Sequence, residues 1–179
     1  CLPGEITLWL STGYPGKQTE RHTKIIHFSL FIIHYSLKRK KGAGKGTQMK
    51  TEFVIVTGIS GAGKSCAVNV MEDIGYFCID NMPPQLIPKF AEICEENDDI
   101  SKVAIVTDIR GGTMFLNLSA TIAELKKRGL DFKLLFVDAN HHVVKQRYRE
   151  TRRKHPLFDA TNGDIDKAID AEREILEPL

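Results

Sequence analysis

The run Phe53-Val54-Ile55-Val56-Thr57-Gly58-Ile59-Ser60-Gly61-Ala62-Gly63-Lys64-Ser65 decides the fold of this chain. Its first four residues are uninterrupted apolar side chains, a pattern typical of a strand that is covered on both faces. The last eight match G-x-x-x-x-G-K-[ST] in full, at the point where the strand pattern gives way to a helix pattern. Glycines at these positions permit backbone angles that turn successive N–H groups onto phosphate oxygens. The run predicts a phosphate-binding loop, and its alternative is an ordinary Gly-rich turn.

The residues of this loop have separate expected roles. The backbone of Gly58, Ile59, Ser60, Gly61, Ala62 and Gly63 is expected to surround the phosphates, helped by the partial positive charge of the helix that follows. Lys64 is expected to reach the β- and γ-phosphates, where it would also act catalytically. The Ser65 hydroxyl is expected to ligate Mg²⁺.

Short apolar runs alternate with helical patterns from residue 53 to the end of the chain. Strands are expected at residues 53–56, 76–79, 103–106 and 132–137, and helices at 64–74, 83–97, 113–128, 141–154 and 164–177. On the helix at 83–97, the residues expected to face inward are Leu86, Phe90, Ile93 and Cys94. This alternation predicts an α/β fold, a P-loop NTPase-type parallel sheet with helices on both faces. A last strand is expected beyond Leu179.

The overall net charge of +2 hides two different compositions. Residues 1–48 carry eight Lys or Arg against two acids, whereas residues 49–179 carry 17 basic and 21 acidic residues. The first segment also lacks a sustained helical or strand period. We therefore expect residues 1–48 to be a non-native or disordered upstream extension, with Met49 as the natural start. A basic arm that contacts nucleic acid is the alternative.

Cysteine usage and hydropathy bear on the expected location of the protein. The four cysteines show neither a zinc-ligand spacing nor a disulfide framework, which favours a reduced, cytoplasmic setting. The apolar stretch at residues 25–37 has 13 residues, against about 20 needed to span a bilayer. No membrane partner is therefore expected.

Acidic residues follow the expected strands, where ligands bind in parallel sheets. Asp108 is the first choice for the acid that serves Mg²⁺, and Asp138 is the second. Asp108-Ile109-Arg110-Gly111 also spells D-x-x-G, a nucleotide-contact pattern of GTPase switch segments, although a strand-end turn is its alternative. Asp80 is expected to be a catalytic or acceptor-binding acid, or else the start of an Asx-turn.

A basic cluster occupies the helix expected at residues 141–154. It consists of Lys145, Arg147, Arg149, Arg152, Arg153 and Lys154. Such a cluster before a Pro/Gly loop is typical of a phosphoryl-transfer lid, whose arginines clamp phosphates. A solvated helix face and RNA-backbone contact are the alternatives.

Residues 49–179 resemble the RapZ/YvcJ nucleotide-binding proteins of bacteria. Besides the loop, the resemblance rests on four segments: Gly75-Tyr76-Phe77-Cys78-Ile79-Asp80-Asn81-Met82-Pro83-Pro84, Val106-Thr107-Asp108-Ile109-Arg110-Gly111, Tyr148-Arg149-Glu150-Thr151-Arg152-Arg153-Lys154-His155-Pro156-Leu157 and Ile169-Asp170-Ala171-Glu172-Arg173-Glu174-Ile175-Leu176. The resemblance implies a domain that binds and hydrolyses ATP and GTP, with Gly58 to Ser65 as its ATP segment and Asp108 to Gly111 as its GTP-associated segment. Residues 1–48 have no counterpart in the family.

The enterobacterial branch of this family acts as an RNase adapter that controls amino-sugar synthesis through small RNAs. Because that role belongs largely to a C-terminal domain outside this chain, RNA and regulatory proteins are expected as partners of that domain, and a homo-oligomer is an expected assembly. We therefore expect a slow, regulatory ATPase and GTPase. The alternatives are a small-molecule kinase, and a non-catalytic nucleotide sensor or RNA-binding adapter.

Overall fold

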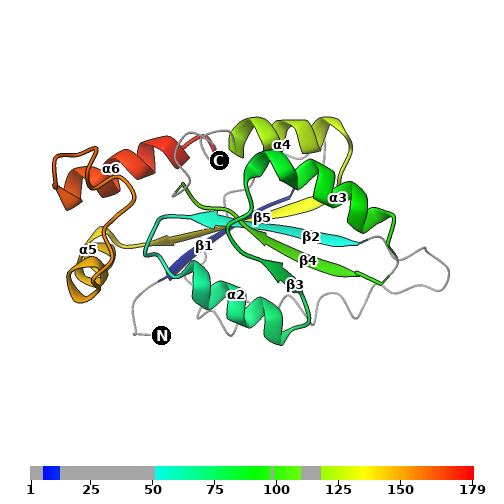
Figure 1. Ribbon diagram of the computed structural model, residues 1–179, viewed down its shortest axis with the longest axis horizontal. Helices are drawn as coiled ribbons and strands as arrows, with labels where there is room; N and C mark the ends of the chain where they lie inside the picture. The colour runs from blue at the N-terminus through cyan, green and yellow to red at the C-terminus, as the bar shows by residue number, and fades with distance from the viewer. Residues whose placement is uncertain (1–5, 13–50, 98, 110–117) are drawn as a thin grey trace.

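A computed structural model describes residues 6–12, 51–97, 99–109 and 118–179 of the chain. These ranges form one sheet with helices packed against it (Figure 1). The strands are β1 (Ile6–Thr12), β2 (Glu52–Gly58), β3 (Phe77–Ile79), β4 (Lys102–Val106) and β5 (Phe132–Ala139). The helices are α2 (Lys64–Asp73), the 3₁₀ turn η1 (Pro84–Leu86), α3 (Ile87–Glu95), α4 (Leu118–Lys127), α5 (His141–Glu150) and α6 (Ile165–Leu176).

The sheet has the strand order β1-β5-β2-β4-β3. Strand β2 pairs in parallel with β4 and β5, and β4 pairs in parallel with β3. Each parallel neighbour is reached through a helical crossover, as the alternation of sequence patterns predicted. The expected α/β fold is therefore confirmed for these four strands and their helices.

Strand β1 runs antiparallel along β5, in a register from Ile6 opposite Ala139 to Thr12 opposite Lys133. No regular structure was expected for residues 1–48, so the pairing of residues 6–12 differs from the expectation. The physical reason is the row of backbone N–H and C=O groups along the outer side of β5, which any adjacent extended segment can pair with. The assignment of Met49 as the natural start stays a prediction.

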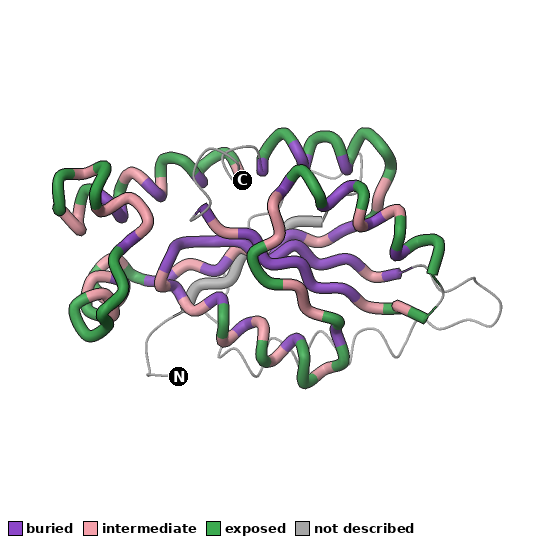
Figure 2. Tube along the Cα trace, viewed as in Figure 1, coloured by how far each residue is buried: buried purple, intermediate pink, exposed green. Residues whose placement is uncertain are grey.

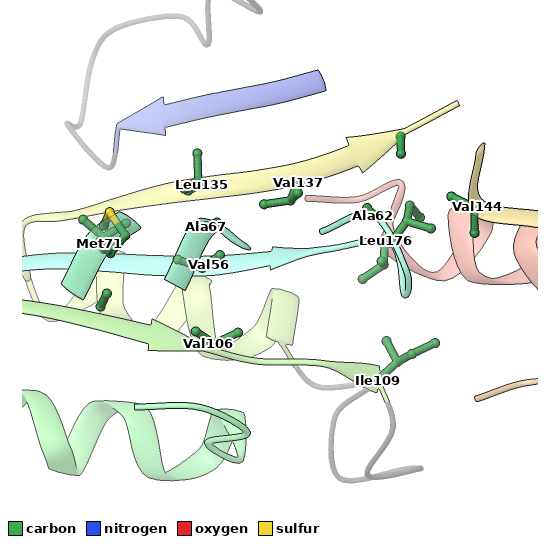
Figure 3. Close-up of a cluster of buried hydrophobic side chains, with 14 of the residues drawn as sticks. Val56, Ala62, Ala67, Met71, Val106, Ile109, Leu135, Val137, Val144 and Leu176 are labelled. Carbon is green, nitrogen blue, oxygen red and sulfur yellow. The ribbon is translucent and has the colours of Figure 1, made fainter. Parts of the chain in front are cut away.

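The two faces of the sheet carry separate cores, because alternate residues of each strand point to opposite sides. Val54 and Val56 of β2 face α2, α5 and α6, in a cluster with Met71, Val144 and Ile169. Figure 3 shows part of this cluster, and Figure 2 shows the purple of buried residues running along the central strands. On the other face, β2 residues Phe53 and Ile55 pack against α3 and α4, in a cluster with Ile87, Cys94, Ile122 and Leu125.

The inward orientation expected for four residues of the helix at 83–97 is wrong for two of them. Leu86 is 55% exposed and Ile93 is 48% exposed, whereas Cys94 is buried and Phe90 is half-buried. The reason is that this segment has two adjacent apolar stripes one residue apart, and the second of them packs in the core. The inward face of α3 is instead made by Ile87, Ala91 and Cys94.

Helix ends differ from the expected ranges in two other places. Helix α5 ends at Glu150, since Thr151 has extended backbone angles, so the later members of the basic cluster lie in the following loop. Helix α4 is described from Leu118, and the expected residues 113–117 lie outside the described ranges.

The described residues also bear on two further expectations, that the chain does not span a membrane and that its cysteines form no disulfide framework. Within the described ranges, no helix has the length and apolar character required to cross a membrane. Cys66 at the start of α2 takes part in a disulfide, contrary to the expected absence of disulfides, because spacing rules detect only local cysteine motifs. Cys78 and Cys94 are free.

The end of β2 touches the neighbouring strand β5 at Gly58. A Cβ at this position would lie 2.0 Å from the backbone oxygen of Val137, and the φ angle of Gly58 is +137°. The backbone N–H of Ile59 then donates to the same Val137 oxygen at 3.0 Å. Only glycine permits both this approach and this angle, so Gly58 fixes where the loop leaves the sheet.

We expect Gly58→Ala to lower the free energy of unfolding by about 3 kcal/mol or more, because backbone strain and overpacking add. Gly75→Ala is the matched control: its φ is +83° but nothing lies within 4 Å of the added Cβ, so a loss of about 1 kcal/mol is expected. Urea unfolding of both variants measures the difference. Equal losses would show that the Val137 contact contributes nothing.

Candidate functional site

A cavity of about 430 Å³ opens at the carboxyl ends of β2, β3 and β4. Parallel sheets bind ligands at this edge because loops and helix N-termini converge there. The lining comes from the predicted loop, from the strand ends and from α5 with the segment after it: Gly61, Gly63, Lys64, Ser65, Cys66, Asp80, Asn81, Val106, Asp108, Arg147, Tyr148, Glu150, Thr151 and Arg153. The structure therefore brings most of the predicted site residues to one cavity.

The loop between β2 and α2 has the backbone of a phosphate cradle. Gly61 and Gly63 have φ angles of +83° and +113°, and Gly63 is the N-cap of α2 without a side-chain cap. The first N–H groups of any α-helix lack intrahelical acceptors and carry partial positive charge. The first residues of α2, Lys64, Ser65 and Cys66, line the cavity. The Cys66 N–H donates to the Gly63 carbonyl at 2.9 Å. The arrangement suits an anionic ligand.

The Lys64 side chain lies over its own loop. Its Nζ donates to the carbonyl oxygens of Gly58 at 2.6 Å and Ile59 at 3.2 Å, and it lies 3.5 Å from Asp108 Oδ2. The side chain is 9% exposed, so its charge is held in a largely desolvated place. A buried cation beside a phosphate cradle is strongly attracted to an incoming anion.

The two acids considered for Mg²⁺ have different surroundings. Asp108 and Ser65 both line the cavity, and a carboxylate and a hydroxyl are hard oxygen donors that suit Mg²⁺. Asp138 instead pairs with Arg173 of α6 at 3.0 Å and is absent from the cavity wall. The described residues contain no group of three acidic, His or Cys side chains that could hold a metal. A Mg²⁺ that keeps several waters and phosphate ligands needs no such group.

The D-x-x-G segment can be followed only in part. Asp108 lies at the cavity, and Ile109 is buried in the core cluster shown in Figure 3. Arg110 and Gly111 lie outside the described residues. The GTP-associated role of this segment stays a prediction.

Asp80 and Asn81 form the cavity wall at the end of β3. Asp80 Oδ1 accepts the backbone N–H of Asn81 at 2.8 Å, and Asn81 has a left-handed φ of 56°. The turn thus has the side-chain-to-backbone bond of a structural Asp, while its exposed carboxylate also faces the ligand space. The structural and functional interpretations of Asp80 are compatible.

The Cys78 thiol in β3 is two residues before this acid. Burial, with a smaller contribution from the Glu72 charge, raises the pKa of Cys78 to about 11. The sign follows from the thiolate being the charged form, which a desolvated place and a nearby anion both disfavour. Cys78 is therefore a poor nucleophile at neutral pH.

The basic cluster divides between the cavity and the surface. Arg147 and Arg153 line the cavity, and Arg147 Nη1 donates to the carbonyl of Gly61 in the loop at 2.7 Å. Lys145 bonds to Asp166 of α6, and this bond is the main reason that the pKa of Asp166 is lowered. Arg149 and Arg152 are exposed. The phosphate-clamp interpretation stays a prediction for Arg147 and Arg153, whereas Arg149 and Arg152 have the exposure of a solvated face.

A buried acid behind the loop was missed by the sequence analysis. Glu172 of α6 is fully buried, and its two carboxyl oxygens accept the Ser60 backbone N–H at 3.0 Å each. Its Oε1 also accepts the Ser60 hydroxyl at 2.8 Å, and its Oε2 lies 2.9 Å from Nε2 of buried His155. The available signal was an acid within the apolar stripe of α6, beside Ala168, Ile169 and Leu176. Its partner Ser60 is 112 positions away, and no sequence period reports that separation.

The hydrogen positions on His155 follow from its neighbours. Nδ1 accepts the backbone N–H of Leu157 at 3.2 Å, so the ring hydrogen must be on Nε2. Nε2 therefore donates to Glu172, whose carboxyl group also accepts the Ser60 backbone N–H and hydroxyl. This is the pattern in which a buried carboxylate is tolerated.

Comparison with known proteins agrees with this geometry. Residues 51–179 match the RapZ-like N-terminal domain. The chain belongs to the RapZ-like family. It is 54% identical over 129 residues to a protein of Caldicellulosiruptor saccharolyticus, covering 72% of this chain and 44% of that protein. It is 53% identical over 128 residues to a protein of Clostridium acetobutylicum, covering 71% of this chain and 43% of that protein. Both relatives are named nucleotide-binding proteins.

The RapZ-like domain thus spans less than half the length of these relatives. A third relative, from Desulforudis audaxviator, is 46% identical over 130 residues, which are 72% of this chain and 44% of that protein, and has the same name. The matched region contains the loop, Asp80, Asp108 and Glu172.

We expect His155→Ala to lower the free energy of unfolding of the RapZ-like domain by about 3 kcal/mol, because a buried carboxyl oxygen loses its donor and a void remains. His142→Ala is the control: His142 is exposed on α5, so a change within about 0.5 kcal/mol is expected. Chemical denaturation of both variants compares them. Similar losses would contradict a stabilising contact between His155 and Glu172.

Proposed function

We propose that this RapZ-like domain binds ATP and GTP with Mg²⁺ and hydrolyses them slowly, in a regulatory role in the cytoplasm. The observation that carries the proposal is the single cavity in which the phosphate loop, Lys64, Asp108 and Arg147 meet. Glycine backbone and a helix N-terminus supply anion binding, and the oxygen donors supply a place for Mg²⁺. The name of the relatives from Caldicellulosiruptor saccharolyticus and Clostridium acetobutylicum, nucleotide-binding protein, is consistent with this chemistry.

Each residue has a proposed role derived from its place. The loop from Gly58 to Ser65 would hold the phosphates, while Lys64 would leave the Gly58 carbonyl for the β- and γ-phosphates and neutralise charge that develops there. A bound Mg²⁺ would supply positive charge that offsets the charge of the phosphates. Ser65 and Asp108 would hold it from the protein side. Asp80 would orient the attacking water or an acceptor.

The proposed hydrolysis is slow because positioning of water depends on groups at an open cavity edge. Asp80 is exposed and already bonded to the Asn81 amide. P-loop NTPases that contain their arginine in the same chain turn over on the order of 10⁻² per second without a partner. A similar rate suits a protein whose nucleotide state is read rather than consumed. Partner RNA, regulatory proteins and a homo-oligomer belong to the same proposal, through the remaining length found in the relatives.

A small-molecule kinase is the second candidate. It is favoured by the common cavity of Asp80, Asn81 and Arg153, which lies beside the loop and could hold an acceptor. A kinase would consume nucleotide rapidly only when its acceptor is present, which separates it from an intrinsic NTPase.

We expect phosphate release from Mg-ATP and Mg-GTP by the full chain without an acceptor, and a loss on the order of 10²-fold or more in Lys64→Ala. The expected loss follows from removing the cation that faces the transferred phosphate. A colorimetric phosphate assay and nucleotide titration are run together. Binding without release would favour a sensor or an acceptor-dependent kinase, and absence of binding would refute the proposal.

Arg147→Ala is expected to lower phosphate release on the order of 10²-fold, because one prepositioned donor at the phosphates is lost. Arg149→Ala is its matched control on the same helix, since Arg149 is exposed and lies outside the cavity wall. Both substitutions remove the same charge and the same side-chain volume. The ratio of the two rates therefore reports the effect of position alone. If both variants lose only a little of their phosphate-release rate, the whole basic cluster is a solvated surface.

A further inference from the structure

The carboxyl group of Glu172 reaches the back of the phosphate loop and does not line the cavity. We propose that Glu172 is a positioning residue of the nucleotide site. Through Ser60, Glu172 fixes the position of the loop and determines whether Asp108 accepts the Ser60 hydroxyl or faces a cation. His155 holds the Glu172 carboxyl group in place. The proposal rests on the proposed nucleotide-binding function, but its structural half can be tested without nucleotide.

Glu172 fixes the direction of one loop amide. Both of its carboxyl oxygens lie 3.0 Å from the Ser60 N–H, so this amide points away from the cavity toward α6. Ser60 itself is fully buried. Gly61 and Gly63, which follow with left-handed φ angles, line the cavity from the other side of the same loop. Anchoring Ser60 therefore sets the starting point of the part of the loop that faces phosphates.

The Ser60 hydroxyl connects Glu172 to the proposed metal acid. Ser60 Oγ lies 2.8 Å from Glu172 Oε1 and 3.2 Å from Asp108 Oδ1. One hydroxyl has one hydrogen, so it donates to only one of the two carboxyl groups at a time. The shorter distance assigns it to Glu172. The Asp108 carboxylate can then interact with a cation, here the Lys64 Nζ, which lies 3.5 Å from Oδ2.

His155 completes the arrangement from the opposite side. Its Nε2–H donates to Glu172 Oε2, and its Nδ1 is fixed by the Leu157 amide, so the ring cannot reverse without losing both bonds. Tyr148, a residue of the cavity wall, packs edge-on against the His155 ring with centroids 5.1 Å apart. The cavity wall, His155, Glu172 and the loop thus form one contiguous buried unit.

The test uses the full chain and the variant Glu172→Gln. Glutamine has the same shape, but its amide places a donor against either the Ser60 N–H or the His155 Nε2–H. Ile169→Ala is the matched control, because Ile169 is fully buried on the same helix and packs only in the apolar cluster. Folding of each variant is checked by circular dichroism. His155→Gln, which reaches Glu172 without touching the loop, replaces Glu172→Gln if the latter does not fold.

Two measurements are made on each variant. Hydrogen exchange of peptides covering residues 58–65, without nucleotide, reports the order of the loop. Titration with a fluorescent ATP analogue over a range of Mg²⁺ concentrations reports nucleotide affinity and the Mg²⁺ needed for half-saturation. We expect Glu172→Gln to exchange faster in the loop, to bind about tenfold more weakly and to need more Mg²⁺. Ile169→Ala is expected to change none of these in its folded fraction.

Unchanged loop exchange in Glu172→Gln would overturn the positioning role. Faster exchange with unchanged affinity and Mg²⁺ requirement would also overturn it, since the contact would then be structural only. Equal effects of Ile169→Ala would overturn it in the same way. If the wild-type chain binds no nucleotide, the proposed function fails, and the exchange data alone decide whether Glu172 orders the loop.

Discussion

The fold depends on the cost of burying a carboxyl group inside an apolar cluster. Glu172 lies among Ala168, Ile169 and Leu176 on the inner face of α6, where an unpaired charge would be untenable. The protein meets this cost by directing Ser60 and His155 donors at both carboxyl oxygens. Because these donors come from other parts of the chain, they tie α6 to the loop after β2 and to the segment after α5. The loop geometry is a consequence of that packing.

The sheet supplies the rigid part of the site. Alternate residues of β2 belong to two separate cores, so the strand is held from both faces and its end at Gly58 is fixed against β5. The identity of ligand-binding residues can then vary while their positions stay precise, because these residues lie on loops attached to strand ends. The cavity between the loop, Asp108 and Arg147 follows from this attachment.

Much of this arrangement could be predicted from local sequence, and the rest depends on contacts between distant residues. The loop was predictable because a strand, a glycine pattern and a helix are contiguous, and Asp108 because it follows a strand end. Leu86 and Ile93 were wrongly placed because two adjacent stripes of this segment are apolar, and the sequence alone does not show which one meets the core. Asp138 instead pairs with Arg173, a partner on another element that no local pattern reports. Glu172 was missed for the same reason.

Strand β1 turns the outer side of β5 into an occupied position. A backbone edge of a sheet can hydrogen-bond to one strand at a time. Any other extended segment that needs this edge, whether from a second molecule or from a longer form of the chain, must first displace residues 6–12. The register of β1 on β5 spans seven paired positions, all of which such a segment would have to replace.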